Sequence, residues 1–124
     1  MGVVAKLFVD PSDVSGALAA RDSVTNAITA YAGGGQTNAT VLTSAINRVT
    51  TVASAADSVK LPAATVGARV DVINATATNS MNVFPQTGEI INALSANASF
   101  AVAANKAATF ICAVTGTWNS ILTA

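Results

Sequence analysis

Three carboxylates, Asp57, Asp71 and Glu89, are the side chains best suited to acid–base chemistry. Paired carboxylates act as general acid and base only when both reach one substrate. These three stand far apart, each in or beside a segment with strand character, so separate solvated carboxylates are the simpler interpretation. The chain lacks histidine, the commonest general base and metal ligand, and has no calcium-type loop of closely spaced oxygen ligands. We therefore expect no enzyme activity, cofactor or metal; a small hydrolase with dispersed carboxylates is the enzymatic alternative.

The glycine triplet from Gly33 to Gly35 raises the question of phosphate binding. A P-loop places a lysine after its last glycine, whereas Gln36 stands at that position here. We interpret the triplet as a turn. The six basic and six acidic residues cancel, so the chain lacks the excess positive charge that attracts nucleic acid. The sequence thus argues against both nucleotide and nucleic-acid binding.

The single cysteine, Cys112, lies in an apolar run and is expected to be a buried small side chain without thiol chemistry. No apolar stretch approaches the roughly 20 residues of a membrane span. The apolar part of the first ten residues is too short for a secretory signal. These features predict a protein that is synthesised in a cytoplasm and does not enter a membrane.

The elements that would position these residues are short β-prone segments that recur along most of the chain. Turn residues such as Pro62, Gly67, Gly88 and Gly116 separate them. Strands are predicted at residues 39–43, 47–53, 57–61, 68–74, 80–84, 89–93, 98–103, 108–114 and 117–122. We expect an all-β fold, as an antiparallel sandwich, jelly roll or small barrel. The turn from Pro85 to Gly88 suits a hairpin. The aromatic residues occur one to a strand, as core residues would: Phe84, Phe100, Phe110 and Trp118.

The N-terminal region differs from the rest, and we divide the chain into an arm (1–22) and a β-domain (23–124). Residues Leu7, Phe8 and Val9 belong to a short extended apolar piece. The cap and proline pattern that follows is typical of a helix start, so the arm could include a short helix. Residues 23–32 fit both a helical face and a strand; we favour a strand because strands follow.

The chain is unusually poor in charge. Hydrophobic residues make up 52% of it and charged residues 10%, against about 25% charged residues in a typical soluble domain. A neutral surface with few charges offers little electrostatic resistance to self-association. Monomers also rarely leave broad apolar patches in water. We therefore expect identical copies to bury alanine-rich surface against one another.

Several motifs occur together over residues 36–122. They are Val59-Lys60-Leu61-Pro62, the strand pattern from Gly67 to Asn74, the Val-Phe-Pro and Gly-Glu segment from Val83 to Asn92, and Gly116 to Trp118. As a set they resemble a β-rich module of tailed-bacteriophage structural proteins, which occurs in capsid decoration (cement) proteins, head fibres and tail fibres. The resemblance implies a homotrimer and supplies no catalytic residue.

The resemblance implies a structural virion protein on the capsid surface, and the charge-poor composition is consistent with self-association. We expect a homotrimer that bridges neighbouring subunits of the major capsid (coat) protein and stabilises the shell. Leu7, Phe8 and Val9 are hypothetical contacts with the coat or a sister subunit. The alternative is a head- or tail-fibre module that binds a host-surface glycan.

Overall fold

The computed structural model describes residues 21–124, and the regular elements within this part are all strands. In chain order they are β1 (Val24–Thr29), β2 (Thr40–Val41), β3 (Ile46–Thr51), β4 (Ser58–Lys60), β5 (Arg69–Asn74), β6 (Met81–Phe84), β7 (Ile90–Ile91), β8 (Phe100–Val102), β9 (Ala107–Val114) and β10 (Thr117–Leu122). The all-β prediction is confirmed, and every predicted strand overlaps an observed one. Residues 23–32 contain strand β1, whereas the predicted helix start at Asp10 lies outside the described residues.

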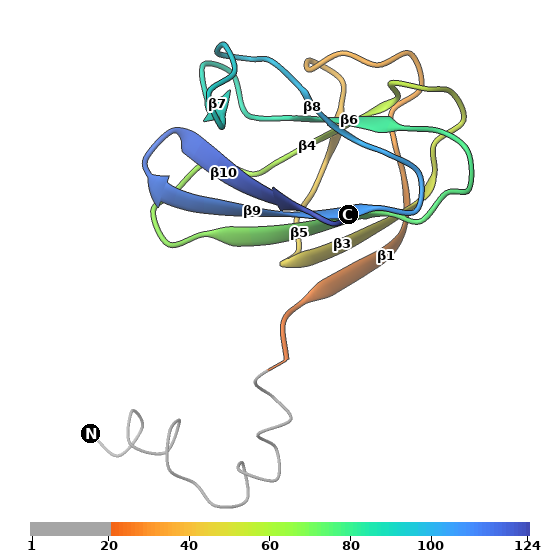
Figure 1. Ribbon diagram of the computed structural model, residues 1–124, viewed down its shortest axis with the longest axis horizontal. Coiled ribbons are helices and arrows are strands. Elements are labelled where there is room, and N and C mark those ends of the chain that lie inside the picture. Colours follow the sequence, from red (N-terminus) through yellow and green to blue (C-terminus); the bar gives the residue numbers. More distant parts are fainter. Residues whose placement is uncertain (1–20) are drawn as a thin grey trace, which may run out of the picture.

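Two packed sheets form the two layers seen in Figure 1. The six-stranded sheet has the order β1-β3-β5-β9-β10-β7, and the four-stranded sheet has the order β2-β4-β6-β8. The chain passes from one sheet to the other after each of its first six strands. Successive strands within each sheet pair in parallel, as β1-β3-β5 and β2-β4-β6. The first six strands therefore wind through three coils, in the manner of a short β-solenoid.

This arrangement corrects the expected antiparallel order. Parallel neighbours need a crossover connection, and here each crossover contains a strand of the opposite sheet. Antiparallel pairing occurs where β8 joins β6 and where β9 joins β5 and β10. The solenoid therefore ends where β8 and β9 run antiparallel to β6 and β5, the strands of the last coil.

The predicted turns have mixed outcomes. Gly116 lies in the β9–β10 hairpin, so the reversal predicted there is confirmed. The segment from Pro85 to Gly88 does turn, and the amide of Glu89 donates to the carbonyl of Gln86 at 2.9 Å. However, this turn leads from β6 in one sheet to β7 in the other. The predicted hairpin is therefore wrong at this position.

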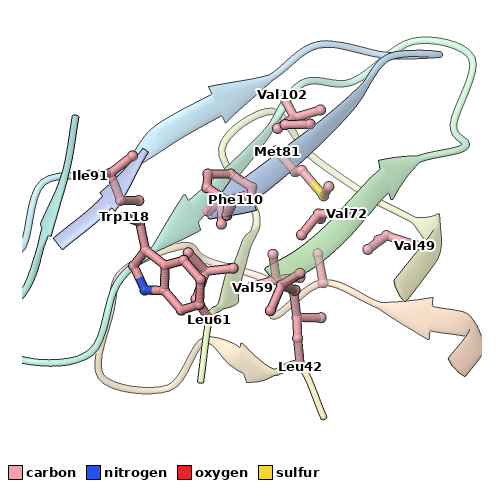
Figure 2. Packing of buried hydrophobic residues seen from close by; sticks show 14 of the residues in the cluster. Leu42, Val49, Val59, Leu61, Val72, Met81, Ile91, Val102, Phe110 and Trp118 are labelled. Atoms are coloured by element: carbon pink, nitrogen blue, oxygen red, sulfur yellow. The ribbon is translucent and has the colours of Figure 1, made fainter. Parts of the chain in front are cut away.

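The core lies between the sheets, where alternate residues of each strand meet (Figure 2). Phe110 and Trp118 are fully buried, and the ring of Phe100 meets that of Phe110 edge to face with centroids 5.6 Å apart. Cys112 is also buried, as predicted. Phe84 and Phe100 are half-buried. The core prediction is therefore confirmed for Phe110 and Trp118 and in part for Phe100, which packs against the core. It is wrong for Phe84, which lies on the side of β6 opposite the buried Met81 and Val83.

Two buried asparagines stabilise the turns of the solenoid. Asn47 donates to the carbonyl of Ser44 at 2.7 Å and to that of Asp71 at 3.2 Å. Asn74, at the end of β5, donates to the carbonyls of Asn79 and Val102, both at 2.9 Å. Buried polar groups are stable only when hydrogen-bonded. These amides therefore connect neighbouring coils through side chains as well as through the strand ladders.

Candidate interaction surface

The three carboxylates have separate structural partners. Asp57 is buried and accepts the amides of Gly33 at 3.2 Å and Ser54 at 3.0 Å. Both carboxylate oxygens of Glu89 accept the amide of Ala64, at 3.1 and 3.0 Å. These bonds join loops that are distant in the sequence, so the two carboxylates have positioning roles that the spacing of acids alone did not reveal.

The third carboxylate, Asp71, lies on β5 and accepts the hydroxyl of Thr109 on β9. The basic residues are likewise divided between the sheets. Arg48 and Arg69 lie on the six-stranded sheet, while Lys60 lies on β4 of the other. The structure therefore does not gather these basic residues on one sheet.

The glycine triplet is a turn, as expected. Gly33, Gly34 and Gly35 all have positive φ angles, which glycine adopts without the steric cost of a side chain. At Gly34 an added Cβ would also lie 2.9 Å from the carbonyl oxygen of Ala56. The triplet thus lets two loops approach closely.

The broadest candidate surface is the face of the six-stranded sheet that points away from the core. In β5 and β9, half-buried or exposed residues alternate with buried ones, so the two sets lie on opposite faces of the sheet. We call the side away from the core the outer sheet face. It is formed by Val24, Ile46, Arg48, Arg69, Asp71, Ile73, Ala107, Thr109, Ile111, Asn119 and Ile121.

The strand register aligns these side chains in rows across the sheet. One row runs from Val24 through Ile46, Asp71 and Thr109 to Ile121, because each is the paired neighbour of the next. Val24 and Ile121, near its two ends, are 61% and 62% exposed. Paired side chains on one face lie about 5 Å apart. The row is therefore apolar at both ends, with the carboxylate of Asp71 and the hydroxyl of Thr109 side by side between them.

The neighbouring rows mix apolar with charged and polar residues. Ile111 is paired with Arg69 on one side and Asn119 on the other, and Ile73 is paired with Arg48 and Ala107. The guanidinium of Arg48 donates to the side-chain carbonyl of Asn26 at 3.1 Å. Three charged residues thus lie among the isoleucines of the outer sheet face.

The corresponding face of the four-stranded sheet is smaller. Its exposed row pairs Val41 with Lys60 and Lys60 with Phe84, and Asn82 lies on the same side of the sheet. The strands that carry it are two to four residues long. The outer sheet face is therefore the larger apolar surface of the two.

The described residues contain no pocket and no cluster of metal-ligating side chains. Nor does this part of the chain hold a helix of the length and apolarity that crossing a membrane requires. Leu7, Phe8 and Val9, the predicted contact residues of the arm, lie outside residues 21–124.

Comparison with known proteins identifies no relative of the chain. No family model, curated protein or solved structure matches it.

Proposed function

We propose that this chain is a structural virion protein that decorates and cements the capsid of a tailed bacteriophage as a homotrimer. The observation that carries the proposal is the outer sheet face, which brings four isoleucines, Val24 and Ala107 together with three charged residues. Apolar side chains gathered on one face outside the core are characteristic of a protein-interaction site. The motifs from Val59 to Trp118 resemble those of phage structural modules, and this resemblance is the reason for proposing a capsid as the partner of that surface.

The proposed mechanism is preferential binding to the assembled shell. A protein that binds one state of a partner stabilises that state by RT ln(1 + [L]/Kd), about 2.7 kcal/mol per site when its free concentration is 100 times Kd. A trimer that bridges neighbouring coat subunits adds this energy at each site it occupies. Such a role requires rigid contact surfaces and no reaction chemistry, so the proposed protein is not an enzyme.

The N-terminal arm supplies the proposed coat contact. Leu7, Phe8 and Val9 together offer three apolar side chains, and burying each is worth roughly 1.5–3 kcal/mol. Deleting residues 1–10 should therefore leave a folded trimer that no longer binds shells. A variant with Leu7→Ser and Phe8→Ser in the full-length chain should bind shells more weakly while keeping its mass.

The test uses coat shells assembled without this chain and then mixed with the purified protein. We expect the protein to sediment with the shells and to raise their melting temperature. The arm-deleted protein serves as the matched control. If wild-type protein neither sediments with the shells nor stabilises them, the cementing function is wrong. Full binding by the arm-deleted protein would remove only the arm from the mechanism.

A further inference from the structure

We infer that residues 6–13 of the N-terminal arm cover the outer sheet face of the same copy. The inference concerns the free protein and goes beyond the proposed function, in which the coat protein contacts both the arm and this face. Three observations favour the arm as the occupant: the place where it joins the domain, the size of the face, and the charges that the arm and the face carry.

The arm joins the domain at the rim of the outer sheet face. Ser23, the last residue before β1, accepts the amide of Ile46 through its backbone carbonyl and the amide of Ala45 through its hydroxyl, both at 3.0 Å. These bonds hold the end of the arm beside β3, and the next residue, Val24, already lies on the face. Ten residue steps separate Asp13 from Ser23 (23 − 13), and ten steps can span about 33 Å.

The face has the size of a short peptide segment and is smaller than a subunit interface. Its five strands span four spacings of about 4.8 Å, and with a strand length of about 20 Å they form a plane of about 380 Å² with a diagonal of about 28 Å. A specific interface between proteins buries at least roughly 600 Å² on each partner. Eight residues at about 3.3 Å each can span about 26 Å. Residues 6–13, which include Leu7, Phe8 and Val9, therefore match the face in length, and the tether lets them reach all of it.

The charged side chains of the arm and the face are opposite in sign and equal in number. The face carries two guanidinium groups, of Arg48 and Arg69, and one carboxylate, of Asp71. Both arginines are exposed and have no ion-pair partner within residues 21–124, although Arg48 donates to Asn26. Residues 1–20 carry the reverse set, one ammonium side chain and two carboxylates: Lys6, Asp10 and Asp13. The arm can therefore supply an opposite charge to every charged residue of the face.

The test joins the arm to the face with a short bismaleimide in the full-length protein. Ser12→Cys lies between the two aspartates of the arm, and Asn119→Cys replaces an exposed residue in the same row of the face as Arg69. Cys112 is buried and should stay unmodified. We expect rapid cross-linking within one chain, which keeps the single-chain mass on a denaturing gel. In the matched control, Ser12→Cys is combined with Ala101→Cys, an exposed residue on the outer side of the four-stranded sheet. This pair should react at least about 10-fold more slowly, because the arm is held at the other sheet.

A charge-exchange series tests the pairing itself. Asp10→Lys with Asp13→Lys should slow the cross-link to Asn119→Cys about 10-fold, because two attractions become two repulsions. Arg48→Glu with Arg69→Glu should slow it to the same extent, and the four changes together should restore the original rate. The emission of Trp118, buried in the core, reports whether each variant is folded.

Three results would overturn the inference. They are equal cross-linking at positions 119 and 101 in folded protein, an unchanged rate after charge reversal, and cross-links between chains, which would place the arm on a neighbouring copy. These results leave the proposed cementing function standing, because they are measured without shells. A protein that fails to bind shells but shows the cross-link within one chain would overturn the proposed function alone.

Discussion

Replacing Asn74 by alanine should lower the free energy of unfolding by about 3 kcal/mol. The side-chain amide of Asn74 donates to the carbonyls of Asn79 and Val102. Its carbonyl oxygen accepts the amide of Thr76 at 3.1 Å and the hydroxyl of Thr76 at 2.7 Å. Four hydrogen bonds at about 1 kcal/mol each give an upper estimate of about 4 kcal/mol. Asn79 is only half-buried, so in the variant water can hydrogen-bond to its carbonyl oxygen and reduce the loss of stability.

The measurement is urea unfolding followed by the fluorescence of Trp118, the chain's single tryptophan. All proteins are compared at one concentration, because self-association adds to apparent stability. A loss of about 3 kcal/mol corresponds to a fall in melting temperature of about 12 °C or more. Asn38→Ala is the matched control, since Asn38 is exposed, lies outside the outer sheet face and makes no side-chain hydrogen bond within the described residues. If Asn74→Ala costs no more than this control, the amide does not stabilise the coil as argued.

Three further predictions concern loops and core. Asp57→Ala removes the acceptor of two loop amides. It should lower the free energy of unfolding by about 3 kcal/mol in the same urea assay, because each hydrogen bond to a charged group is worth about 1.5–3 kcal/mol. A loss below about 1 kcal/mol would contradict the loop contact. Gly34→Ala should lower the melting temperature of the protein more than Gly35→Ala does, because only the Cβ at position 34 would clash with the carbonyl oxygen of Ala56. Equal melting temperatures of the two variants would exclude that clash. Cys112 is buried, so a thiol reagent should modify it only at the rate of unfolding, and rapid labelling of native protein would contradict its burial.

The positions of the strands could be predicted because they depend on local pattern. In β5, Val70 and Val72 alternate with Asp71 and Ile73, and the structure buries the first pair between the sheets. Side chains in a strand point alternately to its two faces, so the sequence alone contains this information. Proline also has a local effect: β4 ends at Lys60, two residues before Pro62.

Strand pairing was harder to predict because partners are chosen by contacts between distant segments. Antiparallel pairing is the commoner arrangement for short strands separated by turns, and it led to the wrong hairpin at Pro85. A signal for parallel coils was nevertheless present. The segments that end at Pro62 and Pro85 are similar and lie 23 residues apart (85 − 62). Repeats of 20–50 residues are typical of solenoids, and the structure pairs the two segments in parallel one residue away from that offset, with Val59 beside Val83.

The distinction between local pattern and contacts of distant segments also explains which functional features could be predicted from the sequence. The composition predicts that apolar surface is covered, because it fixes how few charges are available. The composition could not locate that surface in the fold. The outer sheet face combines β1, β3, β5, β9 and β10, and these strands come together only when the solenoid forms. Arg69 and Asp71 illustrate the point. In the sequence they are two ordinary charges on a strand, and only the register places them beside Ile111 and Thr109 on one face of the sheet.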